Sequence, residues 1–496
     1  MSTKTRFSNW KRGFNGDTPR NQIRDDEVTE ANNVVYRAGD WEKRPGYTQP
    51  YTATGDADTV IEVADYIEDG SSTLICATTN NIYYLNGTTW VDRSSAITPS
   101  GDVSNKWFFA ELAGVSYATN GVDNIHMSTN PSGTNYTAIS WDTSTVGSLT
   151  GTTVTRANSI CTMNNRLWMA GVTDGTDGQV DFRLRYTNAN DFDRTEGSTG
   201  YYDEDVSQTA IMAITPTLDN GLVLFKEDMV AIVQNTGNPV VSPVLRFRPG
   251  LLAPKAYAHL PNGAIWYVSK YGFHLFQNGM PEEVGRNRVR EWFLTNLYRA
   301  EAYNIYCWAD MENAEVHTIF PTATGEPDKD LVYNWSTGAF YTWDIDAYCG
   351  FYRDREQTAT NRYFGTASGI VKLAGGTDDN GTAITSSIIT KSYDHGDLMN
   401  LHRPVDASTM PNTPNYIQGS RIYSDARPTT TTFYFGTQDY GTETPTFTNS
   451  ATITDTNGYQ PVANVDPTTT AFMTVKVEGF SNVSEVTVEW SEAGDL

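Results

Sequence analysis

One short unit recurs along this 496-residue chain, and it constrains the fold more than any other feature. Each copy has an apolar strand, a small polar turn and a second apolar strand. The copies occupy residues 73–90, 115–130, 159–171, 218–234, 260–279, 330–345 and 362–376. Asn and Gly fill the turns because two-residue hairpin loops need positive φ. The copies recur at roughly the 40 to 50 residues that a four-stranded propeller blade requires, so the sequence predicts a β-propeller.

The predicted fold class is therefore all-β, with a β-propeller of six to seven blades. An extended N-terminal lead (1–50) precedes the propeller with its insertions (51–397), and a C-terminal β-sandwich-like module follows (398–496). A run of separate sandwiches is the rival architecture, but it would show unrelated hairpins rather than one returning unit. Residues 173–200 are long enough to be an insertion between strands.

Two further segments carry predictions of secondary structure. Residues 283–298 are expected to form a helix, because the apolar residues of this segment approximate one face: Val289, Trp292, Phe293 and Leu297. After 398–401 the content of Thr and Asn rises, and alternating strands are expected at 421–424, 431–435, 471–479 and 483–490.

The composition agrees with a turn-rich all-β protein. Hydrophobic residues make up 39% of the chain and charged residues 19%, while 12% are aromatic, including 28 Tyr and 12 Trp. Aromatic side chains suit a pleated surface. The length exceeds that of one ordinary hydrophobic core, so several domains or one large repeat architecture is expected.

The formal net charge of −24 disfavours specific binding to nucleic acid or to anionic lipid. Two interpretations of this acidity stay open. It can serve solubility, or it can form a wall around a passage through which DNA slides without adhering.

The spacing of the cysteines and the hydropathy of the chain indicate the compartment in which the protein is made. Cys76, Cys161, Cys307 and Cys349 form no C-x-x-C pair, so we expect buried thiols in strands. No apolar segment follows Met1, and no run approaches the roughly 20 apolar residues of a membrane helix. We therefore expect synthesis in a cytosol without an export signal, and no membrane insertion.

Motifs for catalysis or metal binding are incomplete. Residues 336–343 only partly match the Asp-box of sialidases, since the Asp and the Gly are missing. Residues 174–181 have the spacing of a calcium loop but lack the bidentate Glu, and 378–381 fit an ordinary turn. Gly-rich phosphate loops, nucleophile elbows and Cys/His arrangements are missing as well. We expect no catalytic residue, no metal site and no cofactor, and hence no enzyme.

The six histidines and one pair of arginines are the remaining candidates for a functional role. The histidines stand singly, without metal-ligand spacing: His126, His259, His274, His317, His395 and His402. Arg246 and Arg248 lie two residues apart on one face of a strand. We expect these arginines to pair with acidic neighbours, either at an interface or within a blade.

Residues 21–47 form a charged lead that ends in a corner around Trp41. Gly39-Asp40 and Pro45-Gly46 are turn dipeptides on either side of this Trp. In one interpretation the apolar residues of the lead supply an edge strand and corner to the first sheet. These residues are Val34, Val35, Tyr36, Trp41 and Tyr47. In the other interpretation the lead docks on a neighbouring subunit.

The lead also resembles the start of a known family. An Asp/Glu-rich segment is followed by Ala-x-Asn-x-Val at 31–35 and by Gly-x-Trp-x-x-Arg-Pro-Gly at 39–46. This pattern is similar to that of the β-propeller nozzle proteins of short-tailed double-stranded DNA phages, also called packaged-DNA stabilisation or tail tubular proteins. The resemblance covers the lead closely and the remainder as architecture, and the last strands of the chain also resemble the C-terminal module of that family.

The resemblance implies a structural virion protein of the phage tail, assembled in the host cytoplasm. Six copies would form a homohexameric ring below the portal and the tail adaptor protein, with further tail proteins or fibres nearby. The ring would retain packaged double-stranded DNA and serve as its exit channel, without sequence-specific binding. The residues expected as assembly contacts, or as the corner that orients them, are Arg24, Asp25, Asp26, Asn32, Trp41, Arg44, Pro45 and Gly46.

Two alternatives belong to other functional classes. The first is a tail-associated carbohydrate-binding protein or glycan hydrolase, with Trp266, Tyr267 and Trp343 as stacking platforms at a blade surface. The second is a cellular propeller scaffold, which only the lead motif disfavours.

Overall fold

A computed structural model describes most of the chain. The described residues are 2–8, 10–37, 39–56, 58–68, 71–146, 149–189, 191–195, 200–218, 221–235, 241–277, 279–353, 361–373, 375–392, 415–417, 431–438, 445–453, 468–470, 472–480, 482–483 and 485–491. The predicted strand at 421–424, the boundary at 398, His395 and His402 lie outside these ranges.

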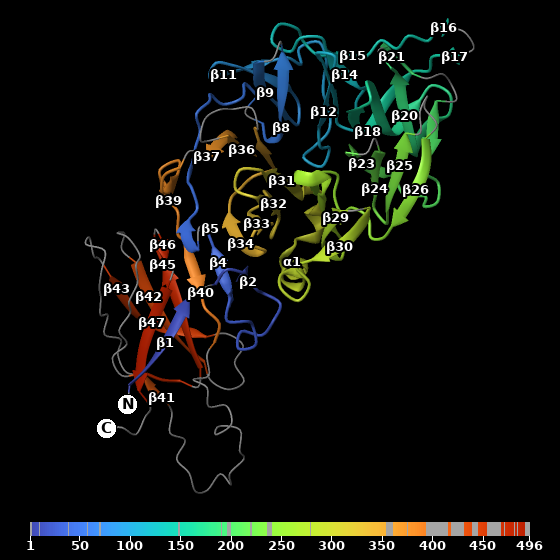
Figure 1. The fold of residues 1–496 in the computed structure, drawn as a ribbon. Coiled ribbons are helices and arrows are strands. Elements are labelled where there is room, and N and C mark those ends of the chain that lie inside the picture. The colour runs from blue at the N-terminus through green and yellow to red at the C-terminus, as the bar shows by residue number, and fades with distance from the viewer. Residues whose placement is uncertain are drawn as a thin grey trace.

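Among the described residues, six groups of consecutive strands form sheets of the propeller, and Figure 1 shows them following one another from blue through yellow. Five of these sheets contain only their own consecutive strands, whereas the sixth continues into strands outside the propeller. The first three contain β8 (Val60–Glu68), β9 (Ser71–Thr78), β10 (Ile82–Asn86) and β11 (Thr89–Asp92); β12 (Phe108–Leu112), β13 (Val115–Thr119), β14 (His126–Ser128) and β15 (Thr137–Ala138); and β18 (Val154–Met163), β19 (Arg166–Asp174), β20 (Gly178–Asn188), β21 (Asp191–Thr195) and β22 (Tyr201–Asp203). The next three contain β23 (Ile211–Pro216), β24 (Gly221–Lys226), β25 (Val230–Asn235) and β26 (Val241–Phe247); β27 (Tyr257–His259), β28 (Ile265–Ser269), β29 (Gly272–Gln277) and β30 (Met280–Val284); and β31 (Tyr306–Asp310), β32 (Glu315–Phe320), β33 (Lys329–Asn334) and β34 (Ala339–Asp344).

A closing sheet joins the two ends of the propeller. It contains β35 (Cys349–Tyr352), β36 (Arg362–Thr366) and β37 (Gly369–Leu373), and its outer strand is β7 (Tyr47–Thr48) from the N-terminal lead. Thr48 pairs with Lys372, and Tyr47 pairs with Leu373. The last sheet is therefore completed by a segment that precedes the first.

The sheets surround a common axis. The first strand β8 contacts both β12 and β35, and further contacts join β12 to β18, β18 to β23, β27 to β31 and β31 to β35. A buried ion pair crosses between these strands, since Lys255 Nζ lies 2.9 Å from Glu62 and the Tyr306 hydroxyl donates to the same carboxylate at 2.8 Å. The prediction of an all-β fold with a β-propeller of six to seven blades is confirmed.

The repeated units account for this result. As far as their residues are described, the seven predicted units lie on β9–β11, β13–β14, β18–β19, β24–β25, β28–β29, β33–β34 and β36–β37. The predicted insertion at 173–200 is wrong in part, because this segment supplies β20 and β21 of a propeller sheet. Short hairpins connect the sheets at β16 (Thr145–Val146) with β17 (Leu149–Thr150) and at β38 (Asp378–Asp379) with β39 (Thr382–Ala383).

The predicted helix is shorter than its sequence pattern. Only α1 (Arg290–Asn296) is α-helical, whereas Glu283 belongs to β30. The chain turns between the two elements through Gly285 at φ 78° and Asn287 at φ 59°. Two 3-10 turns accompany the strands, η1 (Pro261–Gly263) and η2 (Arg299–Asn304). Within the described ranges, no helix has the length and apolar character to cross a membrane.

Most of the described strands near the C-terminus form two groups, and β46 (Asn482–Val483) pairs instead with residues 41–42 of the lead. One sheet has the order β1 (Ser2–Ser8), β47 (Glu485–Ser491), β41 (Asn415–Ile417) and β44 (Thr468–Thr470), and Figure 1 shows blue β1 beside red β47. The other group contains β40 (Ser387–Ile389), β45 (Phe472–Glu478), β42 (Thr431–Gln438) and β43 (Thr446–Ile453). The expected strands at 431–435, 471–479 and 483–490 correspond to β42, β45 and β47. The division at residue 398 stays a prediction.

Candidate functional site

The N-terminal lead lies between the propeller and the C-terminal strands, and this junction is the candidate site. The strands of the lead are β2 (Gly13–Phe14), β3 (Glu27–Val28), β4 (Glu30–Asn32), β5 (Val34–Arg37) and β6 (Asp40–Lys43), followed by β7. Strand β4 runs parallel to β34 of the propeller and antiparallel to β40. A single sheet therefore continues from β31–β34 through the lead into β40, β45, β42 and β43.

Arg44 is the centre of the corner. Its side chain is 1% exposed, and its guanidinium donates two hydrogen bonds to Asp379, at 3.0 and 2.5 Å. Further hydrogen bonds go to Asn33 Oδ1 at 3.0 Å and to the main-chain oxygens of Asp344 and Pro45 at 3.1 and 3.2 Å. Every nitrogen of this guanidinium thus donates within the chain, so Arg44 stabilises the junction.

Two asparagines of the lead bind one propeller carboxylate. Asn32 Nδ2 and Asn33 Nδ2 donate to Asp344 Oδ2 at 2.6 and 2.9 Å, and Lys329 contacts Asp344 Oδ1. Although partial burial raises it, the pKa of Asp344 is held below its ordinary value by Lys329 and by these two amides. The carboxylate is therefore charged at neutral pH, and both of its oxygens accept contacts from lead or propeller side chains.

Trp41 packs against the propeller from the same corner. Its ring is 1% exposed and meets Tyr341 edge-on, with 5.8 Å between ring centroids. Close packing also explains Gly46, because a Cβ at this position would lie 1.9 Å from the main-chain oxygen of Asp378. Only glycine fits against that backbone.

The charged start of the lead is exposed. Arg24 is 65% exposed and forms an ion pair with Asp26 at 3.1 Å, whereas Asp25 is 85% exposed and contacts Lys391. Surface ion pairs of this kind contribute little stability. Arg24 and Asp25 are therefore available to another molecule without disturbing the fold.

The predicted lead residues thus fall into two groups. Trp41, Arg44 and Gly46 are buried and form the corner within their own chain, while Pro45 and Asn32 are half-buried. A role for all eight as assembly contacts or as the orienting corner stays a prediction. Replacing Trp41 and Arg44 together would damage the junction, so such a double variant would not separate assembly from folding.

A pocket of about 420 Å³ opens between the lead and α1. Its lining includes Phe14, Arg20, Glu30, Trp292 and Lys329. The lining mixes both charges with two aromatic rings, and Trp292 packs edge-on against Phe14 with 5.0 Å between ring centroids. This pocket is a product of lead docking, since residues of the lead form one of its walls.

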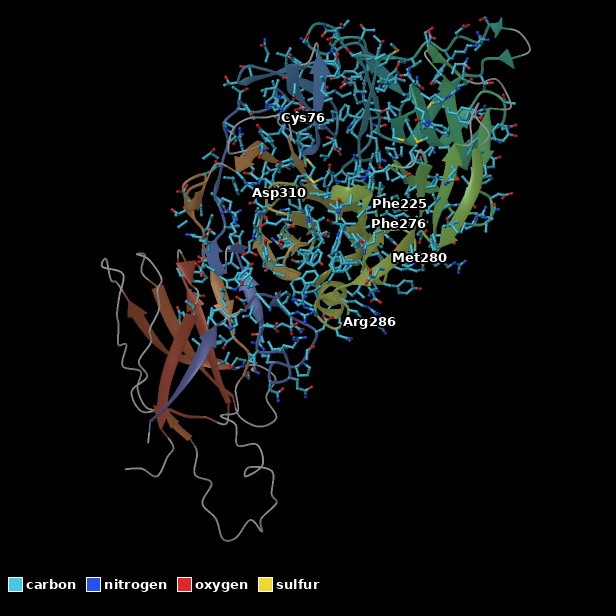
Figure 2. The ribbon with its side chains drawn as sticks, viewed as in Figure 1. Cys76, Phe225, Phe276, Met280, Arg286 and Asp310 are labelled. Carbon is cyan, nitrogen blue, oxygen red and sulfur yellow. The ribbon has the colours of Figure 1, made fainter. Side chains whose placement is uncertain are left out.

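A buried cluster of charged groups lies behind Tyr341. The Tyr341 hydroxyl donates to Glu315 Oε1 at 2.7 Å, and His317 Nδ1 lies 2.7 Å from Asp330 Oδ2. Burial opposes the charged form of His317, but the neighbouring Asp330 and Glu315 carboxylates raise its pKa to about 9. Figure 2 labels Asp310, a further member of this cluster, inside the propeller.

The sequence did not predict this cluster, because its residues lack the spacings that metal ligands have on helices and in loops. Glu315 and His317 alternate on β32, and alternation places both on one face of a strand. Asp310 pairs directly with Glu315 across the hairpin. The pattern Glu-x-His within an apolar strand was the available signal.

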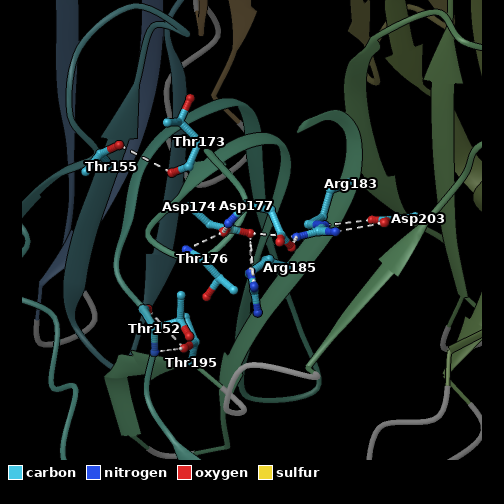
Figure 3. A network of polar contacts seen from close by, with 10 residues as sticks. All are labelled: Thr152, Thr155, Thr173, Asp174, Thr176, Asp177, Arg183, Arg185, Thr195 and Asp203. Atoms are coloured by element: carbon cyan, nitrogen blue, oxygen red, sulfur yellow. Dashed lines mark hydrogen bonds and ion pairs between the residues drawn. The ribbon is translucent and has the colours of Figure 1, made fainter. Parts of the chain in front are cut away.

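The segment that resembles a calcium loop is an Asp-capped turn. Asp174 accepts hydrogen bonds from the main-chain N–H groups of Thr176 and Asp177 at 2.9 and 2.8 Å. Arg183 Nη1 and Arg185 Nη2 each donate to Asp174 Oδ2 at 2.9 Å, as Figure 3 shows. The turn interpretation of this segment is confirmed, and two guanidinium groups neutralise its buried carboxylate.

Two other predictions are confirmed. Asp378 and Asp379 form β38 of a hairpin whose turn residues, Asn380 and Gly381, have φ of 49° and 88°. Arg246, on β26, pairs at 2.9 Å with an acidic neighbour, the buried Glu204, which follows β22 of the preceding sheet.

Arg248 is 81% exposed, and its closest acidic contact is Asp228 at 3.9 Å. The cysteines are all free, and Cys76, Cys307 and Cys349 are buried in strands, whereas Cys161 is half-buried. The expectation of buried thiols is therefore confirmed for the first three.

The aromatic residues proposed for glycan stacking are not on the surface. Trp266, Tyr267 and Trp343 are 1%, 0% and 1% exposed. Trp266 Nε1 lies 3.2 Å from the Thr318 hydroxyl, and Trp343 Nε1 donates to the main-chain oxygen of Val34. The prediction that these three rings form stacking platforms is wrong, because all of them belong to the core.

Comparison with known proteins gives no family. No protein-family model matches the chain, and no curated protein matches it. Virginiamycin B lyase from Staphylococcus aureus is similar at 10% identity over 64% of this chain and 96% of that one, with a TM-score of 0.40. YCF48 bound to D1 peptide is similar at 11% identity over 65% of this chain and 94% of that one, with a TM-score of 0.36.

A longer overlap is found with the extracellular domain of the hybrid two-component system BT3049 from B. thetaiotaomicron. The identity is 13% over 82% of this chain and 47% of that one, with a TM-score of 0.40. Similarity at this level carries no argument about activity or partners. The chain is a β-propeller protein on the evidence of its own sheets.

Proposed function

We propose that this chain is a structural virion protein, a subunit of a tail nozzle ring that retains packaged DNA and serves as its exit channel. The main observation in support of the proposal is the structural role of the lead motif. Its buried groups, Trp41, Arg44 and Gly46, hold the lead against the propeller and the β38–β39 hairpin through packing and hydrogen bonds, while β4 of the lead pairs with β40. Such a motif serves to join parts of the chain into one body, as a structural subunit requires.

Charge and symmetry fit the same role. A net charge of −24 keeps a duplex from adhering to the wall of a passage. A ring of identical subunits needs two different surface patches that meet head to tail and close by rotation. The exposed Arg24 and Asp25, with side chains 65% and 85% exposed, offer one such patch beside the junction.

The assembly is tested directly on the purified full chain. Light scattering at increasing concentration and negatively stained images are expected to show closed rings of six copies with a central opening. Duplex DNA mixed with the protein at physiological salt is expected to migrate freely. A chain that stays monomeric at all concentrations, both alone and with the tail adaptor protein, would contradict the proposal.

Surface variants separate assembly from folding. Arg24→Ala combined with Asp25→Ala is expected to reduce ring formation while the thermal unfolding temperature of the monomer stays unchanged. Arg248→Ala is the control, because Arg248 is an exposed arginine, 81% against 65% for Arg24, and it follows β26 of the propeller rather than lying in the lead. If the control lowers ring formation as much as the lead variant does, the lead is not the assembly surface.

A glycan-binding or glycan-cleaving role lacks a specific observation in its favour, since the three rings assigned to it are buried. Binding to a glycan array, or release of reducing sugar by the purified protein, would nevertheless replace the structural proposal with this one. Neither result is expected.

A further inference from the structure

Beyond the proposed function, and independently of it, the buried cluster behind Tyr341 has the composition of a metal site. The ligand atoms of Asp310, Glu315 and His317 all lie within 4.8 Å of one another, and all three residues are buried. They belong to the two strands of one hairpin, β31 and β32, so their positions are fixed by the sheet.

Two ligand atoms in this cluster have no hydrogen-bond partner among the described residues. His317 Nε2 and Glu315 Oε2 are buried, and the 3.7 Å between them is too long for a hydrogen bond. Both side chains are at most 1% exposed. Unpaired buried polar atoms are costly, and they call for an ion or an ordered water.

The surrounding groups prepare these atoms for a metal. Asp330 accepts a hydrogen bond from His317 Nδ1 at 2.7 Å, so Nε2 is the ring nitrogen that faces Glu315, and a metal ion bound there would displace the proton of Nε2. A histidine whose second nitrogen donates to a carboxylate is the usual arrangement around bound zinc. Tyr341 holds the other oxygen of Glu315, and Trp308 stacks on the imidazole with 4.1 Å between ring centroids.

The charges in the cluster also favour a divalent cation. Three carboxylates are buried here, those of Asp310, Glu315 and Asp330. Arg362 contacts Asp310 and also binds the half-exposed Glu312, so its one positive charge is shared between these two carboxylates. A divalent ion would supply further positive charge beside Glu315, and charges buried together need such balance.

We propose that His317, Glu315 and Asp310 bind a divalent transition-metal ion, with Zn²⁺ as the expected occupant. Imidazole and carboxylate ligands suit zinc at about 2.0 to 2.2 Å, so two ligand atoms 3.7 Å apart can share one ion. Asp310 already accepts hydrogen bonds from two main-chain N–H groups, from the Asn313 amide at 2.6 Å and from Arg362. It would bind the ion in exchange for the Asn313 amide.

Metal analysis of the full-length protein tests this site. Because the cluster is enclosed, the ion has to enter during folding, so the protein is expressed in zinc-supplemented medium or refolded with Zn²⁺. About one Zn²⁺ per chain is expected after desalting. Glu315→Gln and His317→Gln are each expected to lose it, whereas His274→Gln, at a buried histidine of another sheet, retains it.

Two results would overturn the proposal: a folded wild-type protein without metal, or variants at Glu315 and His317 that retain it. Should these variants fail to fold, refolding of the wild type with Co²⁺ decides the question. Visible d–d bands together with X-ray absorption that shows imidazole and carboxylate ligands would support the site. A colourless protein, or thiolate ligands, would exclude it.

Discussion

Arg44 and Asp379 lie 335 residues apart in the chain and are joined by two parallel hydrogen bonds of 3.0 and 2.5 Å. The contact fastens the lead to the β38–β39 hairpin, which follows the last propeller strand. The Arg44 side chain is only 1% exposed, so Asp379 stabilises the positive charge that water does not reach. The ion pair therefore joins the lead, which precedes the propeller, to the hairpin that follows it.

Removal of this ion pair is expected to destabilise the protein. Arg44→Ala should lower the free energy of unfolding by about 3 kcal/mol, because it leaves buried acceptors without a donor. Arg44→Lys should recover only part of this loss, since an ammonium cannot form the bidentate pair. Denaturant unfolding measures both variants. The exposed Arg248→Ala is the control and should change the value by less than about 0.5 kcal/mol.

A double-mutant cycle identifies the partner. If Asp379 is the main partner, Arg44→Ala and Asp379→Asn should be non-additive by about 1 kcal/mol or more. Additive effects of the two changes would show that the other acceptors of Arg44 stabilise it instead.

Gly46 is expected to tolerate no side chain. In Gly46→Ala the added Cβ would meet the main-chain oxygen of Asp378, so the corner and the β38–β39 hairpin would have to separate. A loss of about 3 kcal/mol or more in unfolding free energy is expected. Gly133→Ala is the matched control, because a Cβ there meets nothing within 4 Å. Equal thermal unfolding temperatures for the two variants would contradict the close approach.

Local features of the fold were predictable from the sequence, because their causes are local. The turn at Asn380 and Gly381 has φ of 49° and 88°, and these are the residues that tolerate such values. The length of the helix was overestimated because its start is decided by a non-local contact. Its pattern continues through Glu283, but pairing with β29 holds that residue in β30.

Non-local features could not be predicted in the same way. The sequence marks Arg44 as notable but does not point to Asp379, and it gives no sign that β4 would lie between β34 and β40. Both depend on long-range pairing. The burial of Trp343 was missed for a similar reason, since its partner is a main-chain oxygen of the lead.

Asp174 is expected to contribute acid-sensitive stability. Burial raises the pKa of this carboxyl, but hydrogen bonds from the Asp177 N–H and from Arg183 and Arg185 outweigh burial and lower the pKa to about 2. A lowered pKa in the folded state contributes stability that is present above the ordinary value of 3.8 and is lost as the pH falls towards 2. The contribution is on the order of 2 kcal/mol at neutral pH.

Asp174→Asn tests this dependence, because asparagine cannot titrate. The difference in unfolding free energy between wild type and variant should shrink as the pH is lowered from 5 towards 2, on the order of the contribution given above. Urea unfolding at several pH values gives this difference. A difference that is constant over this range would show that Asp174 does not titrate differently on folding.

His126 is expected to weaken the fold at mildly acidic pH. The side chain is buried beside Trp107, and neither ring nitrogen has a hydrogen-bond partner among the described residues. Burial lowers the pKa of His126 to about 4, against the opposing effect of Asp123. As the pH falls, the unfolded chain therefore binds this proton before the folded chain does. The contribution of the neutral His126 to stability is fully present above pH 6.5 and is lost as the pH drops from 6.5 to 4.

His126→Leu removes the site of protonation and replaces it with an apolar side chain, so the unfolding free energy of this variant should depend less on pH between 6.5 and 4. Thermal unfolding at pH 7 and at pH 4.5 distinguishes the two proteins. If wild type and variant lose equal stability between these values, the imidazole is protonated equally in the folded and unfolded states, and its burial has no energetic consequence.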